Sequence, residues 1–230
     1  MRSYADACGI TRALDVVGER WAIPVVRELV FGPRRYTDLA AALPGVSTNI
    51  LGDRLKELTD AGVTVRRRLP PPAASTVYEL TPWGAALEPV LVALGRWAAH
   101  TPADLSAQTL SASSLALSLK TIFDSNAAAG ADLDLVLAMG EDIFEARVHG
   151  GTFTIRRLEA AVAEADERSP GSQIRVDSDP KTLAAVIFQD LEPGQASRTG
   201  RLRVDAPSDA LDTFARCFPL PDPPDERNPR

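Results

Sequence analysis

The stretch from Ser47 to Leu80 constrains the fold of this 230-residue chain more than any other. Ser47 can cap a helix that ends at Gly62, because a serine hydroxyl accepts from the first amides and glycine tolerates the conformation that stops a helix. The apolar stripe of this helix consists of leucines at helical spacing: Leu51, Leu55 and Leu58. Its other side is polar, so we expect one buried and one exposed face.

A β-hairpin with one basic arm is predicted directly after this helix. Residues 63–69 begin with alternation and then turn basic, and residues 76–80 are rich in β-forming types. The proline-rich segment 70–75 between them is incompatible with regular structure. Successive residues of a strand point to opposite faces, so the three arginines at 66–68 cannot all meet one surface. We expect one of them to pack along its stem or to pair with an acid.

Further helices are predicted on both sides of this unit. Their apolar spacing places them at residues 10–17, 21–31, 38–43 and 82–99. Thr37 is predicted to cap the third of these helices, and Pro89 to kink the last. A helix pair, a capped helix and then a basic hairpin follow one another in a winged helix-turn-helix, whose capped helix enters the major groove of DNA.

The candidate DNA contacts lie at the start of the capped helix, on its polar face and on the basic arm. Hydroxyls at a helix N-terminus can meet phosphate, asparagine offers a bidentate pattern that matches adenine, and basic side chains can hold the backbone. For each arginine alone, a solvated surface role is an equally good interpretation. The candidates are Arg34, Arg35, Ser47, Thr48, Asn49, Asp53, Arg54, Lys56, Arg66, Arg67 and Arg68.

The formal net charge of −6 hides a difference between the two halves of the chain. Residues 1–100 carry 12 Lys/Arg and 10 Asp/Glu, a net of +2, whereas residues 101–230 carry 13 and 21, a net of −8. Phosphate contact depends on local clustering, so a net of +2 is compatible with DNA binding. The acidic half is a poor partner for DNA, and we expect the two halves to bind different partners.

The second half of the chain predicts a separate α+β domain. Alternating apolar residues at 133–137 and 144–155 predict a hairpin that turns at His149-Gly150-Gly151, and further strands and helices follow to residue 220. We therefore predict a first domain over 1–100, a linker over 101–114, a second domain over 115–220 and a disordered tail over 221–230. Helical propensity is also present at 159–168, and Ser208 is placed to cap the last helix.

The two cysteines, Cys8 and Cys217, fall in different halves and do not form a disulfide framework, which favours a reducing compartment. Cys8 lies at a helix start, where a thiol can sense oxidants. Its commoner fate would be a small buried core residue, and for Cys217 we expect burial. The three tryptophans are expected to be buried anchors or dimer contacts: Trp21, Trp83 and Trp97.

The chain offers no catalytic, metal-binding or membrane signature. His100 and His149 have no cysteine or histidine at ligand spacing, and no nucleophile motif stands out. Residues 1–7 lack the apolar core of a signal peptide, and no run approaches the ~20 apolar residues of a membrane span. We predict a cytoplasmic protein that is not an enzyme and uses no metal or cofactor.

Residues 8–99 resemble the HxlR family of winged-helix regulators, which is close to the MarR-type regulators. The matching residues are Cys8, Leu14, Gly18, Trp21, Arg35-Tyr36-x-x-Leu39, Leu43-Pro44-Gly45-Val46-Ser47, Leu51-x-x-Arg54-Leu55-x-x-Leu58-x-x-x-Gly62-Val63, Tyr78-x-Leu80-Thr81-x-x-Gly84 and the run from Pro89 to Trp97. The resemblance implies a dimer formed mainly by the first and last helices, and repressor or activator activity. The proline-rich hairpin tip departs from the shorter wing that is usual in the family.

Residues 115–219 more loosely resemble the sterol-carrier-protein fold. The matching pattern comprises the strand region Leu133–Leu158, Ile174-x-Val176-Asp177-x-Asp179-x-x-Thr182-Leu183, Gly200-x-Leu202-x-Val204 and the helix end Phe214–Leu220. The resemblance implies a curved, mostly antiparallel sheet packed by helices around an apolar cavity, and it transfers no individual ligand contact. A core that these apolar residues simply fill is the equal alternative.

These observations predict a two-domain transcription regulator. A dimeric winged helix-turn-helix would bind a palindromic operator as a repressor, and an apolar effector in the second domain would control it. The rival interpretation is a small-molecule or lipid carrier whose first domain is an interaction module. The basic hairpin and the capped helix favour DNA.

Overall fold

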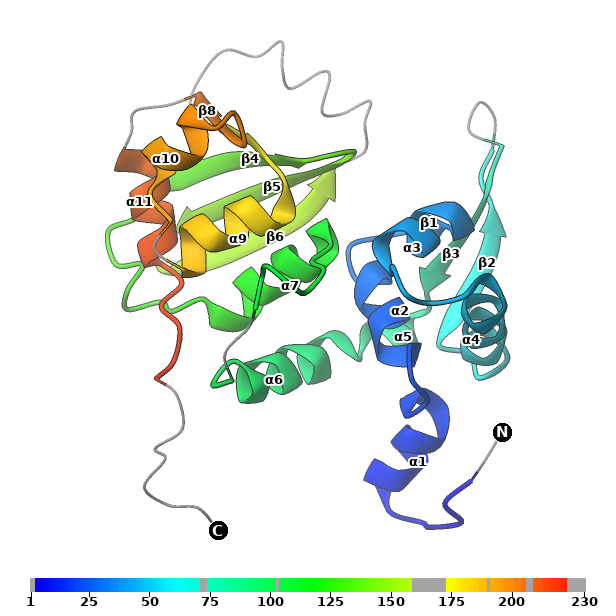
Figure 1. Ribbon diagram of the computed structural model, residues 1–230. Helices are drawn as coiled ribbons and strands as arrows, with labels where there is room; N and C mark the ends of the chain where they lie inside the picture. Colours follow the sequence, from blue (N-terminus) through cyan, green and yellow to red (C-terminus); the bar gives the residue numbers. More distant parts are fainter. Residues whose placement is uncertain are drawn as a thin grey trace. The chain divides into compact units, whose positions relative to one another are not determined.

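The computed structural model describes residues 3–70, 74–101, 104–158, 173–189, 191–205 and 209–222 (Figure 1). The chain divides into two compact units, Met1–Leu91 and Val92–Arg230. Each unit combines helices with a sheet, so the predicted α+β class is confirmed.

The first unit has the element order of a winged helix-turn-helix. It contains α1 (Gly9–Val17), α2 (Ala22–Leu29), β1 (Arg34–Arg35), α3 (Tyr36–Ala42), α4 (Thr48–Asp60), β2 (Thr64–Arg68), β3 (Thr76–Leu80) and α5 (Pro82–Ala85). The three strands form an antiparallel sheet in the order β1-β3-β2. The helix α6 (Glu88–Ala98) contains the boundary between the two units.

The core of the first unit is the apolar stripe that the sequence predicted for α4. Its three leucines, Leu51, Leu55 and Leu58, are at most 1% exposed. α4 packs against α2, and α2 packs against α3, and these two helices contribute Val25, Val26, Leu29 and Leu39 to the core. Burying each such side chain stabilises a fold by about 1.5–3 kcal/mol, so α4 is fixed by its apolar face and its other face is free to serve a partner.

Two local predictions for this unit were wrong. Thr37 does not cap the third helix, because α3 begins one residue before it, with Arg35 at the N-cap position and the Arg35 backbone amide donating to Asp38 Oδ2 at 3.1 Å. The kinked helix predicted over 82–99 is two helices, α5 and α6, and Pro89 falls in the first turn of α6, where a missing amide is tolerated.

The junction between the hairpin and α5 depends on close packing at Gly84. The Thr81 hydroxyl accepts from the Gly84 amide at 3.0 Å and donates to the Gly62 carbonyl at 2.7 Å. A Cβ at Gly84 would lie 2.0 Å from the Val63 carbonyl oxygen and would therefore clash with it. Glycine is therefore required here, and the contact ties α5 to the first residues after α4.

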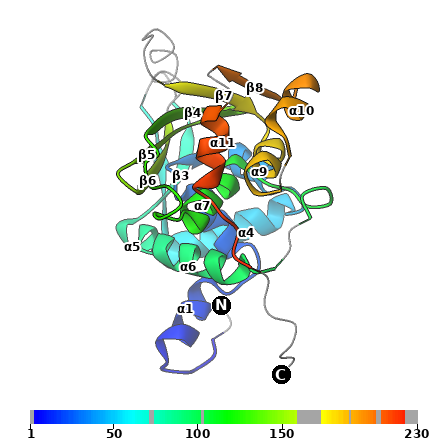
Figure 2. The same cartoon turned by 90° about the vertical axis from the view of Figure 1, so that its left-hand side faces the viewer.

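The second unit is a five-stranded sheet with helices packed on one face (Figures 1 and 2). Its elements are α7 (Ala112–Ile122), β4 (Leu133–Met139), β5 (Asp142–His149), β6 (Thr152–Leu158), β7 (Ile174–Ser178), α9 (Pro180–Phe188), α10 (Pro193–Arg198), β8 (Leu202–Asp205) and α11 (Asp209–Arg216). The strand order is β6-β5-β4-β7-β8, and every pairing is antiparallel except that of β4 with β7. The predicted hairpin and the mostly antiparallel sheet are therefore present.

Side chains alternate between the two faces of this sheet. The face that packs against α7, α9 and α11 carries fully buried residues: Leu135, Leu137, Phe144, Ala146, Val148 and Val176. Four aromatic rings, those of Phe123, Phe153, Phe214 and Phe218, pack together with centroids 4.8–6.3 Å apart. These rings fill the region where the apolar strands and the last helix were expected to enclose a cavity.

The second unit differs from the sequence predictions in two elements, and other predictions for it fall outside the described residues. The helix α7 begins at Ala112, inside the stretch predicted as a linker, and the short helix α10 was not predicted. The helix expected at 159–168, the Ser208 cap and most of the tail lie outside the described residues. Among the helices that the structure describes, none is long and apolar enough to cross a membrane.

Candidate nucleic-acid interface

Two intramolecular hydrogen bonds fix the N-terminus of α4. The Ser47 hydroxyl accepts from the Ile50 amide at 3.3 Å, so the predicted N-cap is confirmed. The Tyr36 hydroxyl of α3 donates to the Thr48 carbonyl at 2.7 Å. Ser47 and Thr48 are nevertheless exposed, and the second bond fixes α4 against the preceding helix, as a recognition helix requires.

The face of α4 opposite to the leucines is exposed and polar. It carries Thr48, Asn49, Asp53 and Lys56. Within the described part of the chain, the side chains of Asn49, Asp53 and Lys56 make no hydrogen bond or ion pair. Their donors and acceptors are therefore available to a partner molecule.

Gly52 lies on the same face, one helical turn from Asn49 and Lys56. A Cβ built on it would meet no atom within 4 Å, so nothing in the described structure requires glycine there. Glycine inside a helix costs about 1 kcal/mol relative to alanine. The exposed face of α4 therefore has a depression at Gly52, where a side chain is missing, and the packing of the unit does not explain it. The sequence analysis assigned no role to Gly52.

The hairpin separates its three arginines as strand geometry requires. Arg66 and Arg68 lie on one face of β2, opposite Tyr78 and Thr76 of β3, and Arg67 lies on the other. Arg67 forms a two-pronged ion pair with Glu79, with Nε–Oε1 at 3.0 Å and an Nη–Oε2 distance of 2.7 Å. These contacts raise the pKa of Arg67 above its ordinary value. The expectation that one arginine pairs with an acid is confirmed.

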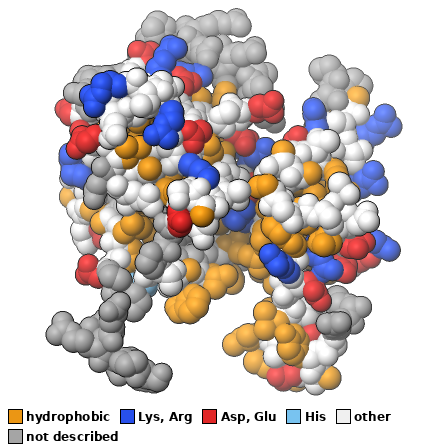
Figure 3. Space-filling view, viewed as in Figure 1, with side chains coloured by type: hydrophobic (Ala, Val, Ile, Leu, Met, Phe, Trp, Pro, Cys, Tyr) orange, Lys and Arg blue, Asp and Glu red, His pale blue; other side chains and the backbone are white. Residues whose placement is uncertain are grey.

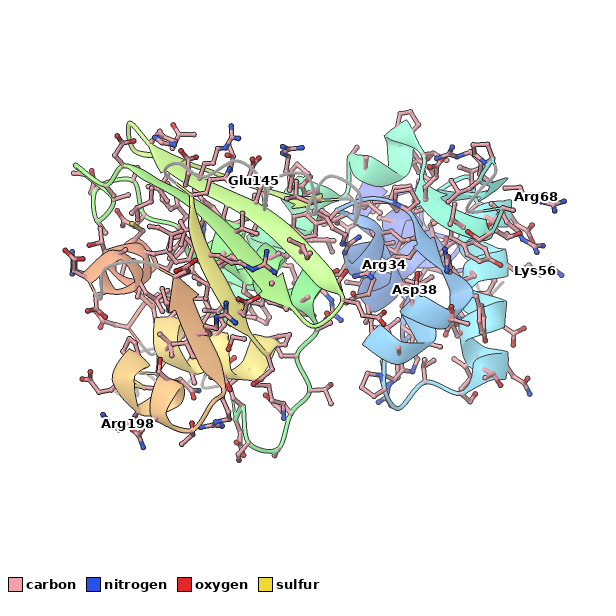
Figure 4. The ribbon with its side chains drawn as sticks, turned by 90° about the horizontal axis from the view of Figure 1, so that it is seen from above. Arg34, Asp38, Lys56, Arg68, Glu145 and Arg198 are labelled. Atoms are coloured by element: carbon pink, nitrogen blue, oxygen red, sulfur yellow. The ribbon has the colours of Figure 1, made fainter. Side chains whose placement is uncertain are left out.

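Arg66 and Arg68 remain exposed and make no ion pair within the described residues. Lys and Arg side chains gather over the wing strands in Figure 3. Lys56 from α4 and Arg68 from β2 both project from the edge of the first unit in Figure 4. The exposed face of α4 and this face of β2 thus combine hydrogen-bonding groups with unpaired positive charge, the two components of DNA recognition.

The remaining basic candidates are less available. Arg54 is bound to Glu57 by an ion pair, and its side chain is only 15% exposed. Arg34 is half-buried in β1 and lies away from the edge that carries Lys56 and Arg68 (Figure 4). Arg35 is exposed, at the N-cap position of α3. Sequence spacing alone did not separate these three arginines from the unpaired ones.

The two cysteines have opposite environments. Cys8 is exposed at the N-cap of α1, so the expectation that it is a buried core residue was wrong. Hydrogen bonds from the backbone amides of Ile10 and Thr11 lower its pKa below the ordinary value. Cys217 is buried, as expected, and burial raises the pKa of its thiol. Within the described residues, no group of three His, Cys, Asp or Glu side chains is placed to hold a metal ion.

Large apolar side chains are exposed on α1 and on α6, the helix that contains the boundary between the two units. On α1, Ile10 is 73% exposed and Leu14 41%. On α6, Trp97 is 76% exposed, and Val90 and Leu94 are about half-exposed. Figure 3 shows hydrophobic side chains gathered over both helices. Trp97, and also Trp83 at 58% exposure, are therefore not buried anchors.

Comparison with known proteins identifies the first unit. Residues 16–104 match the family model of the HxlR-like helix-turn-helix. Over 87 residues, or 38% of this chain and 81% of the relative, the chain is 38% identical to the uncharacterized HTH-type transcriptional regulator YvaP of Bacillus subtilis. It is 33% identical to the HTH-type transcriptional regulator YodB of the same organism, over 37% of this chain and 77% of that one.

The chain was also compared with a solved structure. The reduced form of YodB from B. subtilis is 30% identical, covers 43% of this chain and 100% of its own, and superposes with a TM-score of 0.38. The family model ends at residue 104, so it does not reach the five-stranded sheet. The chain is more than 30% identical to YvaP and YodB, and it covers more than two thirds of each of these regulators. It therefore belongs to the HxlR-like helix-turn-helix family.

Proposed function

We propose that this protein is a transcriptional repressor that binds a palindromic DNA operator as a homodimer. The observation that carries the proposal is the exposed face of α4, where Asn49 and Lys56 have no partner, beside the unpaired Arg66 and Arg68 of β2. In this assignment Asn49 reads a base edge and the basic residues hold phosphates. Membership of a family of transcriptional regulators gives independent support.

The homodimer is proposed from the exposed apolar faces of α1 and α6. Ile10, Leu14, Leu94 and Trp97 expose more apolar area than water-facing helices usually carry. A second copy of the chain would cover them symmetrically, and each copy would present one α4 to one half-site. A dimer that covers promoter DNA excludes polymerase, and we therefore propose repression rather than activation.

We propose that the second unit is a sensor that binds an apolar effector, on a fold of the sterol-carrier type spanning residues 115–220. Its support is the mostly antiparallel sheet with helices on one face. Its acidic balance makes direct DNA contact unfavourable, so it would act on the dimer instead. In this proposal residues 221–230 form the tail, and the protein is a cytoplasmic non-enzyme.

The second candidate is a small-molecule carrier whose winged unit is an interaction module. A cavity of about 530 Å³ in the second unit favours it. The two candidates differ in one requirement, since a carrier has no need of unpaired arginines beside a polar helix face. DNA binding by the whole chain therefore decides between them.

Selection of DNA from a random-sequence pool by the full-length protein tests the proposal. We expect an enriched palindrome whose half-sites are about one helical turn apart, ~34 Å. Gel filtration of the protein with and without this DNA should give a dimer in both cases. Failure to enrich any sequence, or a monomer that protects one half-site, would contradict the proposal.

A further inference from the structure

The second unit contains a cavity beside the helix that begins in the winged unit. It has a volume of about 530 Å³, within the ~300–1,000 Å³ of small-molecule sites. Its walls are the end of α6, the segment after it, α7, the end of α9 and the chain near Leu220. The described lining residues are Gly95, Ala98, Ala99, His100, Thr101, Leu105, Gln108, Leu110, Leu115, Ser118, Thr121, Ile122, Ala184, Phe188, Gln189, Leu220 and Pro221.

The lining restricts the charge of a ligand. Most of these side chains are apolar, the others are hydroxyl, amide or imidazole groups, and no Lys, Arg, Asp or Glu is among the described lining residues. A carboxylate or ammonium group in this cavity would lose water without gaining an opposite charge, which is costly. The cavity therefore favours an uncharged molecule over a fatty acid or an amine.

His100 adds a directional preference. Its Nδ1 lies 2.8 Å from the backbone carbonyl oxygen of Asp222, and because a carbonyl can only accept, Nδ1 must donate. The neutral ring then has Nε2 as its acceptor. Because His100 is a lining residue, a ligand hydroxyl that reaches Nε2 could donate to it.

The cavity also adjoins the part of α6 that is fixed to the sheet domain. Arg96 Nε donates to the Thr121 carbonyl of α7 at 3.3 Å, and a Cβ on Gly95 would lie 3.1 Å from Thr121 Oγ1. Gly95 and Thr121 both line the cavity. On the same helix, Leu94 and Trp97 are exposed and belong to the proposed dimer face. A molecule in the cavity would thus contact the helix that also carries part of that face.

We propose that this cavity is the effector site, and that its ligand is an uncharged, largely apolar molecule with a hydroxyl group. This inference rests on the proposed function, because it locates the control of the same regulator. A ligand bound in the cavity changes the preferred packing of α6 against α7. It thereby changes the fraction of dimers whose geometry fits the operator. The coupling is reciprocal, so operator DNA changes ligand affinity by the same factor.

Three naphthalene compounds test the chemistry of the site, because they share one ring system and differ in one group. Each is used to displace Nile red, a neutral apolar fluorophore, from the full-length protein at pH 7. We expect 2-naphthol to displace it about 3- to 10-fold more effectively than naphthalene, from one hydrogen bond, and 2-naphthoate least effectively. Strongest displacement by 2-naphthoate, or no binding of Nile red, would overturn the inference.

Two variants test the location. Ser118→Phe places a ring in the cavity and should weaken Nile red binding at least tenfold, whereas Ala129→Phe, an exposed position outside the lining, should not. His100→Phe should abolish the preference for 2-naphthol over naphthalene, while naphthalene still displaces Nile red. This variant tests the location of the site even if Ser118→Phe does not fold. Unchanged Nile red binding by Ser118→Phe, or an unchanged preference for 2-naphthol in His100→Phe, with folding verified, would place the site elsewhere.

The same samples separate this inference from the proposed function. We expect 2-naphthol to shift the operator affinity of the wild type by about 5-fold or more, a coupling in the typical range, and to leave the operator affinity of Ser118→Phe unshifted. Wild-type protein that binds no DNA contradicts the proposed function. If the wild type binds both DNA and Nile red, and Ser118→Phe binds Nile red and responds to 2-naphthol as the wild type does, only the proposed site is contradicted.

Discussion

The winged unit and the sheet unit both present arginines, but they place them in different surroundings. On the sheet face opposite to α7, α9 and α11, Glu145 binds Arg147 and, at 2.6 Å, Arg156, while Asp134 binds Arg147 at 3.2 Å. On the face of β2 proposed to meet DNA, Arg66 and Arg68 form no ion pair within the described residues. Arg147 and Arg156 are occupied by carboxylates of the protein itself, whereas Arg66 and Arg68 are free to meet a negatively charged partner.

The comparison predicts its largest effect for the unpaired arginines. Arg66→Ala combined with Arg68→Ala should weaken binding to all DNA sequences, on the order of ten- to a hundredfold, and reduce the slope of log affinity against log salt by about 2. Arg67→Ala is the matched control, because Glu79 already neutralises Arg67, and it should change the slope less. Fluorescence anisotropy over a salt series measures both. An equal effect of Arg67→Ala would break the distinction between paired and unpaired arginines.

The paired arginines should affect stability and leave DNA affinity unchanged. Burial raises the pKa of Glu145, but the hydrogen bonds from Arg156 and Arg147 outweigh it and lower the pKa overall. Arg147→Ala combined with Arg156→Ala should therefore destabilise the protein by about 1–3 kcal/mol at pH 7, less than for a fully buried pair because the two arginine side chains are 46% and 64% exposed.

The pH dependence of this effect has a definite sign. A carboxylate with a lowered pKa stabilises the fold above its unfolded-state pKa, and that contribution is lost as pH falls through the lowered value. The difference in urea-unfolding free energy between wild type and the double variant should thus shrink from pH 7 toward acid. Arg175→Ala, whose partner Asp177 is more exposed than Glu145, is the control and should cost less. A difference that is constant with pH would exclude the ionised Glu145 as its cause.

Asn49 should contribute specificity rather than general affinity. Asn49→Ala should reduce the discrimination between the selected operator and random DNA by about 1–3 kcal/mol, because it removes a bidentate base contact. Asn126→Ala, at an exposed asparagine of the sheet unit, should have no effect. Competition binding with operator and random duplexes measures the change. If operator and random affinities fall equally, Asn49 does not read a base.

Gly52 tests how closely the helix approaches its partner. Gly52→Ala should raise the unfolding free energy by about 1 kcal/mol, because alanine is the better helix former and a Cβ meets no protein atom there. The same change should weaken DNA binding if the depression at Gly52 admits the duplex. Gly194→Ala in α10 should leave DNA affinity unchanged. A stabilised Gly52→Ala protein with wild-type DNA affinity would show that this glycine has no role in binding.

The smallest expected effect on DNA binding concerns Cys8. Its exposure and lowered pKa predict that iodoacetamide modifies it well before the buried Cys217, with a pH midpoint below the ~8.5 of an ordinary thiol. We nevertheless expect peroxide or quinone to change operator affinity of the wild type little, because the proposed switch is the ligand. If oxidation releases DNA from the wild type but not from Cys8→Ser, Cys8 is the principal switch instead.

Much of the fold followed from local patterns. The leucine spacing of α4, its Ser47 cap and the arginine hairpin are each determined by residues close in sequence, and the structure has all three. The break between α5 and α6 was indicated in position but not in extent, because Pro89 has no amide to donate to the carbonyl of Ala85, where α5 ends, and local sequence does not show whether a helix bends or stops there. The buried Glu28 of α2, paired with Arg27, likewise gave no apolar signal.

The candidate site was predictable as a surface but not residue by residue. Counting arginines could not show that Arg67 reaches Glu79 across the hairpin or that Arg54 reaches Glu57, because both depend on side-chain conformation. The cavity position was not predictable either, because aromatic rings fill the region beside α11 and the space beside α6 is bounded by segments far apart in sequence. Sequence periodicity locates apolar residues and does not show which of them meet.

Photocrosslinking tests the central claim most directly. The full-length protein is made with p-benzoylphenylalanine in place of Lys56 on α4, or in place of Thr154, an exposed residue beside Arg147 on the sheet. We predict that irradiation with the selected operator crosslinks the Lys56 variant to DNA and leaves the Thr154 variant uncrosslinked. Crosslinking at Thr154 and not at Lys56 would contradict the assignment of DNA binding to the winged unit.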